Sequence, residues 1–242
     1  MNEFRKLFIL LGVVLMSISL HGQDFEDFIR KYTDANGKLY MQPLADAFGA
    51  NLNSGLYHNA RIEKNGFQLY LGLTAMVAYI PEQSRTFEGT TQGFFSPEQN
   101  AIVPTIFGNS EIVEVSGEEG TAYTFPGGLN VNRLPLAAPT LSIGSYYGTN
   151  ATFRYMAADI GDDFGKINFF GWGIRHSIDQ YFEMLPINLA AGYYMQSFSV
   201  GDFVVAKAWL INLQGSYSWH LLTFYGGLGF ENSTMDVDYV YE

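Results

Sequence analysis

The run from Ala206 to Tyr241 alternates apolar and polar residues almost without a break. Its first half places one set of apolar residues on one parity: Trp209, Ile211, Leu213, Tyr217 and Trp219. The other parity is polar: Asn212, Gln214, Ser216 and Ser218. Successive side chains of a β-strand point to opposite faces, so this run predicts two strands that turn near His220 and carry one apolar and one polar face.

The first 22 residues have the pattern of a secretory signal peptide. Arg5 and Lys6 precede an apolar stretch from Leu7 to Leu20, and Gly22 supplies a small residue before a cleavage site. This stretch is shorter than the roughly 20 residues that a spanning helix needs, so we prefer a signal peptide at residues 1–22 to a membrane anchor. The chain has no cysteine, which excludes a disulfide framework.

Export together with a two-faced sheet predicts an antiparallel transmembrane β-barrel in the outer membrane of a Gram-negative bacterium, in contact with its lipid. No run of 18 apolar residues follows Leu20, and Tyr and Phe number 16 and 20, as the aromatic girdles of a barrel require. A soluble β-sandwich has a similar composition. The excess of 24 acidic over 13 basic residues argues against nucleic acid as a partner.

Further strands are predicted along the chain, about nine or ten in all. Alternation indicates strands at 56–62 and 67–79, joined by a tight turn at 64–66, and others between 141 and 196. Links at 64–66, 147–149 and 220–221 are short, whereas those at 81–138, 157–164 and 197–204 are long. This asymmetry is typical of barrels with short periplasmic turns and long outer loops, so we place the 81–138 excursion outside.

Two segments depart from the strand pattern, and together they divide the chain. Residues 23–54 have helical spacing in two parts, separated by a turn signal at 34–37, and we expect them to form a helical plug in the lumen rather than to lie free in the periplasm. The barrel then occupies 55–242, with a long loop at 81–138 that holds most of the prolines. A hairpin is predicted within that loop, from 111–116 to 121–125.

Three stretches carry a resemblance to a known family: residues 43–55, 135–139 and 171–178. They resemble an uncharacterised family of Bacteroidetes outer-membrane proteins and, more distantly, the FadL-type barrels that import hydrophobic compounds. The resemblance implies an N-terminal hatch and a route for apolar ligands. FadL-type barrels have 14 strands and outer-membrane barrels usually end on an aromatic residue, whereas this chain ends at Glu242. We expect a truncated product rather than a smaller barrel.

The polar parity of the strands supplies the candidate lumen-lining residues. These are Arg154, Asn188, Tyr194, Gln196, Asn212, Gln214, Ser216 and Ser218. Ion-selective pores line their constrictions with rings of charge, whereas this set is mostly amides and hydroxyls. It therefore favours passive uptake of small hydrophobic or amphipathic molecules, with no catalysis, no cofactor and no metal. A lumen that is purely structural remains the simplest alternative.

The sequence leaves two further functions open. In the first, the chain is an outer-membrane interaction protein whose 81–138 loop docks a secretion or surface protein. In the second, it is an acyl hydrolase in which His176, Ser177 and Asp179 form a catalytic group, although neighbouring strand residues point apart and a triad is defined by spatial geometry. Asp159, Asp162 and Asp163 lack the spacing of a calcium loop, so we expect them to be a solvated acidic loop.

Overall fold

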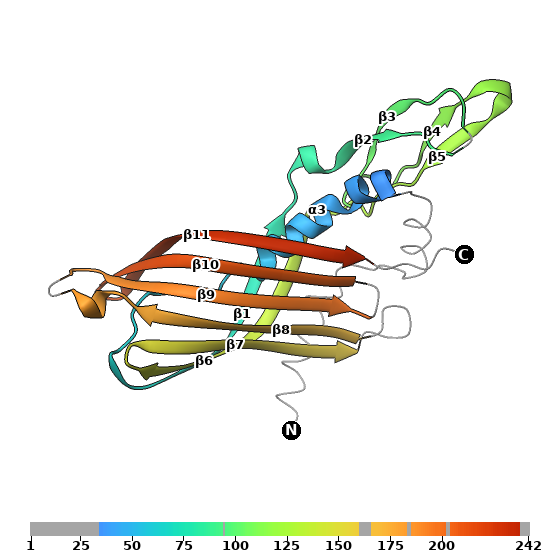
Figure 1. Ribbon diagram of the computed structural model, residues 1–242. Helices are drawn as coiled ribbons and strands as arrows, with labels where there is room; N and C mark the ends of the chain where they lie inside the picture. The colour runs from blue at the N-terminus through green and yellow to red at the C-terminus, as the bar shows by residue number, and fades with distance from the viewer. Residues whose placement is uncertain (1–33, 94, 160–165, 183–184, 202–203, 238–242) are drawn as a thin grey trace. The chain divides into compact units, whose positions relative to one another are not determined.

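A computed structural model describes residues 34–93, 95–159, 166–182, 185–201 and 204–237 (Figure 1). Within these residues the chain divides into two compact units, one made of 34–48 and 77–135 and the other of 49–76 and 136–237. The predicted signal peptide, residues 23–33 of the predicted plug, Asp162 and Asp163 lie outside the described residues.

The second unit is built on a large, mostly antiparallel sheet. Its seven strands are β1 (Asn65–Tyr79), β6 (Arg133–Tyr146), β7 (Thr149–Asp159), β8 (Lys166–Ser177), β9 (Asn188–Val200), β10 (Val204–Trp219) and β11 (Leu222–Val237). They follow the order β1-β6-β7-β8-β9-β10-β11, so that β6 to β11 form an up-and-down meander. The sheet curls into a half-barrel (Figure 1). The described residues therefore form a mostly antiparallel β structure, compatible with the predicted all-β class; they contain eleven strands, of which seven belong to this sheet, against the nine or ten long strands predicted.

The two faces of β10 differ in exposure and in residue type. On β10 the large side chains of Trp209, Ile211, Leu213, Tyr217 and Trp219 are exposed. The alternate positions are buried, and towards the 220–221 turn they are polar: Asn212, Gln214 and Ser216. The strand periodicity predicted from the sequence is thus confirmed on β10, and β11 pairs with it from Trp219 and Leu222 to Val204 and Val237.

The segment from Asn53 to Ile62 lies against the buried face of the sheet. The strand predicted at 56–62 is wrong, because these residues join no ladder. Leu56 packs instead with Tyr194 and Leu210. Ala60 and Ile62 pack with Ala190. The alternation that indicated a strand therefore reflects alternating burial in an extended segment. We call residues 53–62 the covering segment.

The first unit joins one helix to two small hairpins. Helix α3 (Asp34–Leu52) is continuous through the turn predicted at 34–37 and through Pro43. β2 (Thr86–Thr90) pairs with β3 (Asn100–Pro104), and β4 (Val113–Ser116) pairs with β5 (Ala122–Phe125). The second pair confirms the predicted hairpin. Short 3-10 helices lie at Glu82–Ser84, Glu118–Gly120 and, in the other unit, Asp179–Tyr181.

Helix α3 is fixed to these hairpins by buried polar contacts. Asn36 Nδ2 donates to the carbonyl of Thr90 at 2.7 Å, and the Tyr40 hydroxyl donates to the carbonyl of Gly127 at 3.0 Å. Val103, Phe107 and Phe125 are almost fully buried in the same unit. The predicted plug therefore differs from what is observed: residues 34–48 pack with the 81–138 excursion, and the covering segment lies against the sheet.

The links between strands depart from the predicted pattern in two places. The 81–138 link is shorter than predicted, because β6 begins at Arg133, and it contains the strands β2 to β5. The 197–204 link, predicted to be long, spans only 201–203, because β9 continues to Val200 and β10 begins at Val204. Polar residues such as Ser197 and Ser199 remain within a strand here. Among the described helices, α3 included, none has the length and apolar character needed to cross a membrane.

Candidate functional site

The buried face of the half-barrel carries a continuous set of polar side chains. Ten residues of β7, β8, β9 and β10 form it, and each is less than one-tenth exposed: Asn150, Thr152, Arg154, Arg175, Ser177, Tyr194, Gln196, Asn212, Gln214 and Ser216. We call this set the buried polar face. Burial of so many polar groups requires hydrogen-bond partners, and the neighbouring strands and the covering segment supply most of them.

The structure brings together six of the eight residues predicted to line a lumen. Arg154, Tyr194, Gln196, Asn212, Gln214 and Ser216 all belong to the buried polar face. Asn188 and Ser218 have the same parity but lie at the strand ends near the 220–221 turn. Asn188 is half-buried there, and Ser218 is exposed, with its hydroxyl 3.1 Å from that of Thr223.

Arg175 is the centre of a hydrogen-bond network that crosses four strands. Its Nε donates to Asn150 Oδ1 at 3.2 Å, and its Nη1 lies 3.5 Å from Gln214 Oε1. Gln214 Nε2 in turn donates to the Tyr194 hydroxyl and to Asn212 Oδ1, both at 2.8 Å. Such a network fixes the orientations of its members more firmly than isolated pairs do.

Both buried arginines also hold the covering segment through its backbone carbonyls. Arg175 Nη1 donates to the carbonyl of Asn59 at 2.7 Å. Arg154 Nη1 donates to the carbonyl of Ser54 at 3.0 Å, and its Nη2 donates to that of Gly55. Ser216 adds a third anchor, accepting a hydrogen bond from the Ala60 amide at 2.9 Å. The covering segment is therefore held by side chains of the sheet wall.

Three buried polar side-chain atoms are left unpaired among the described residues: Asn53 Oδ1 of the covering segment, and one atom each on β7 and β9, the strands on either side of β8. Arg154 Nε and Gln196 Oε1 are both buried without a hydrogen-bond partner. They belong to one row of the sheet, since Arg154 pairs with Gly171 and Gly171 with Gln196. Gly171 leaves room for the Gln196 amide, because a Cβ at this position would force that amide to move. Each unpaired atom has free capacity for water or a polar group of a solute.

The two guanidinium groups have no carboxylate within 4.0 Å in the described part of the chain; the ion pairs found there join Arg61 to Glu63 and Arg85 to Glu82. A buried cation without a counter-charge is costly, and hydrogen bonds to carbonyls and amides offset part of that cost. The buried polar face is therefore mainly neutral, and it carries two positive charges, those of Arg154 and Arg175.

The structure does not bring His176, Ser177 and Asp179 together as the catalytic group of a hydrolase. Ser177 Oγ donates to Asp179 Oδ1 at 2.8 Å, whereas His176 Nδ1 lies 2.9 Å from Thr149 Oγ1 and its Nε2 lies 2.8 Å from the Tyr181 hydroxyl. Both side chains also contact Gln180, whose backbone amide donates to Ser177 Oγ at 3.3 Å and whose Nε2 lies 3.0 Å from His176 Nε2, and among the described contacts neither side chain is hydrogen-bonded to the other. The described residues also include no group of three or more acidic or histidine side chains placed to hold a metal ion.

Sequence reasoning missed four members of the buried polar face. Asn150, Thr152, Arg175 and Ser177 were not among the candidates. Asn150 and Thr152 share the parity of Arg154 on β7, and that signal was available in the sequence. Arg175 shares its parity on β8 with Gly171 and Gly173, so its neighbours gave no polar pattern.

Comparison with known proteins places the chain in one family. No curated protein and no solved structure shows a significant match. A family model does match, and it covers residues 1–240, which is nearly the whole chain. The protein therefore belongs to DUF6588, a family of unknown function.

Proposed function

We propose that this protein is an outer-membrane β-barrel through which small hydrophobic or amphipathic molecules pass passively. One observation carries the proposal: the half-barrel exposes most of its large apolar side chains on one face and buries amides, hydroxyls and two arginines on the other. Transmembrane barrels have this arrangement, since lipid surrounds them and their interior is polar.

The extent of the apolar face supports a lipid environment over water. On β11 alone, Leu228 is 83% exposed and Phe230 is 81% exposed, and comparable residues continue across β10. Soluble monomers rarely expose contiguous apolar patches above a few hundred Å². In a bilayer the same surface is stabilising, and only closed sheets or helices satisfy the backbone there.

Passive uptake fits the chemistry of the buried polar face better than ion selection does. Asn212, Gln214 and Ser216 offer neutral donors and acceptors, and the described residues of that face include no carboxylate. The covering segment lies across this face, with Leu56 packed against Tyr194 and Leu210. A solute that moves along this face therefore has to pass the covering segment, so the covering segment limits the rate of passage.

A matched pair of leucine variants tests this proposal. The full chain is reconstituted into liposomes, and entry of a fluorescent hydrophobic probe and of uncharged amphipathic solutes is measured. Leu56→Ala removes a buried contact of the covering segment, whereas Leu71→Ala makes the same change on the exposed face of β1, where Leu71 is 77% exposed. We expect entry above protein-free liposomes, faster for Leu56→Ala and unchanged for Leu71→Ala. Entry at the protein-free rate in all three proteins contradicts the proposal.

Docking of a secretion or surface protein is the second candidate, and one observation favours it. The 81–138 excursion is folded, with two hairpins and a core that includes Val103 and Phe125, rather than an irregular loop. A folded surface presents fixed side chains to a partner. Under this alternative, removal of residues 113–125 abolishes capture of a partner by cells while probe entry is unchanged. Under the uptake proposal, the Leu56→Ala effect persists in the shortened chain.

A further inference from the structure

This inference rests on the proposed function and concerns the exposed face of the half-barrel. That face changes from apolar to polar side chains along a line that crosses the strands. We propose that it is the boundary of the lipid hydrocarbon, crossing β8 between Asn168 and Phe170 and β10 between Lys207 and Trp209. Strand residues beyond the line stand in the head-group region and in water. The partner of this face is thus a bilayer.

The strand registers define rows of side chains that point to the same face. Trp172, Met195, Trp209 and Asn232 form one such row across β8 to β11. The next row towards the 201–203 link contains Phe170, Ser197, Lys207 and Thr234. On β9 the apolar side chains therefore stop at Met195, and on β10 the continuous apolar run stops at Trp209, with Lys207 next and Val205 as the one apolar residue beyond it.

The stopping point shifts in one direction across the four strands, although it lies in the same row on β9 and β10. On β8 the last apolar residue is Phe170, one row beyond Trp209, and the following row carries Asn168, Ser199, Val205 and Asp236. On β11 the last apolar residue is Phe230, because Asn232 already occupies the row of Trp209. Between β8 and β11 the boundary is thus displaced by two rows, so it runs at an angle to the rows.

The inclination has the size expected for tilted barrel strands. Two rows are four residues, or about 14 Å at roughly 3.4 Å per residue, and three strand spacings of roughly 4.8 Å also give about 14 Å. A plane that meets the rows with this slope implies strands tilted by about 45° from its normal, at the upper end of the range for outer-membrane barrels. A random edge of a protein interface has no reason to follow this slope.

The height of the apolar face is consistent with the same tilt. On β10 this face runs from Trp209 to Trp219, and its large side chains are exposed. Ten residue steps span about 34 Å along the strand. At a tilt of about 45° the height is about 24 Å, close to the ~25 Å apolar band of outer-membrane barrels.

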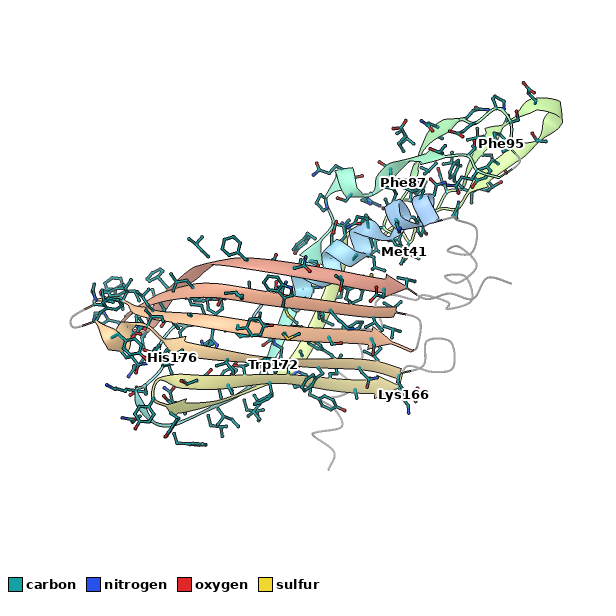
Figure 2. The ribbon with its side chains drawn as sticks, viewed as in Figure 1. Met41, Phe87, Phe95, Lys166, Trp172 and His176 are labelled. Carbon is teal, nitrogen blue, oxygen red and sulfur yellow. The ribbon has the colours of Figure 1, made fainter. Side chains whose placement is uncertain are left out.

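Lysines lie on the polar side of the line, where their charge suits lipid phosphates. Lys207 is exposed in the first polar row of β10, and Lys166 is exposed at the opposite end of β8 from His176, with Trp172 between them (Figure 2). Long basic side chains at this level place their aliphatic stems against lipid and their ammonium groups in the head-group layer.

Nitroxide scanning tests the line directly, because the chain has no cysteine of its own. Single-cysteine variants of the full chain at Asn168, Phe170, Lys207 and Trp209 are spin-labelled and reconstituted in vesicles of phosphatidylcholine and phosphatidylglycerol. Accessibility to oxygen, which concentrates in hydrocarbon, is compared with accessibility to a water-soluble nickel chelate. Labels at Ile211 and Leu213 serve as references inside the apolar band.

We expect labels at Phe170 and Trp209 to favour oxygen and those at Asn168 and Lys207 to favour nickel. Since Phe170 and Lys207 share a row, their opposite preferences are the signature of the inclined line. The same preference at both positions, with Ile211 and Leu213 still favouring oxygen, overturns the boundary alone. If no label favours oxygen, including those at Ile211 and Leu213, the boundary and the proposed function both fail.

Discussion

Arg175 and Asn59 lie 116 residues apart in sequence and are joined by a 2.7 Å hydrogen bond from the guanidinium Nη1 to the Asn59 carbonyl. The same guanidinium reaches Asn150 on β7. One side chain thus connects the sheet wall to the covering segment. Its removal leaves a carbonyl and an amide without partners in a buried place.

Arg175→Gln is therefore expected to lower the free energy of unfolding by about 2–3 kcal/mol, the loss typical of hydrogen bonds to a charged group. Urea unfolding in detergent micelles, followed by tryptophan fluorescence, measures the effect. Arg61→Gln is the matched control, because Arg61 is exposed and pairs only at the surface with Glu63. Its cost should stay below about 1 kcal/mol. Equal losses in the two variants would show that the Arg175 network is not stabilising.

Gly173 lies beneath the ring of Tyr194, and a Cβ at this position would collide with that ring. Gly173→Ala should displace Tyr194 and destabilise the protein by about 1–3 kcal/mol, as overpacking of a close contact does. Gly226→Ala is the control, since nothing lies within 4 Å of the added Cβ there. Thermal unfolding of both variants checks this, and an unchanged melting temperature for Gly173→Ala would contradict the close packing.

Burial raises the pKa of Tyr40 above its ordinary value of 10.0. The folded state therefore favours the neutral phenol, and this contribution to stability is fully present below pH 10 and is lost as the pH rises above it. Tyr40→Phe removes this pH dependence, and it costs about 1 kcal/mol at neutral pH through loss of the hydrogen bond to Gly127. Unfolding of the wild type and the variant between pH 8 and 11 distinguishes them. Parallel alkaline losses would contradict the assignment to Tyr40.

Leu213 lies near the middle of the apolar part of β10, whereas Val205 has the same parity beyond the polar line. Leu213→Arg should therefore cost about 2–4 kcal/mol in vesicles, as a charge at the bilayer midplane does, and Val205→Arg should cost at most about 1 kcal/mol. Chemical unfolding from lipid vesicles measures both. If Leu213→Arg is as mild as Val205→Arg, the exposed face is not in lipid.

Most strands of the half-barrel were accessible from sequence because they carry a two-residue period, whereas the first part of β6, which begins at Arg133, lacks it and lies within the predicted loop. On β10 the parity of Trp209 and Leu213 against Asn212 and Gln214 identified both faces, and the burial of the two sets agrees with it. The turn at 220–221 followed from the break in that period. The polar parity also identified Arg154, Tyr194 and Gln196, since each alternates with apolar residues on its strand.

Long-range contacts explain what the sequence left out. The 56–62 segment has a strand period, yet its partners are side chains such as Arg175 and Ser216, more than 100 residues away. Local spacing does not contain that information. The break predicted within α3 at 34–37 failed for a similar reason: Asn36 donates to the Thr90 carbonyl, and this contact with β2 compensates for weak helix propensity.

Cell fractionation tests whether the apolar face of the half-barrel lies in lipid. Cells expressing the longest open reading frame are separated into soluble and membrane fractions, and the gel mobility of the protein is compared before and after boiling. We expect an outer-membrane protein whose mobility shifts on boiling, as that of a closed, detergent-resistant barrel does. A soluble periplasmic protein without a shift would contradict it, because the apolar face would then pack against protein.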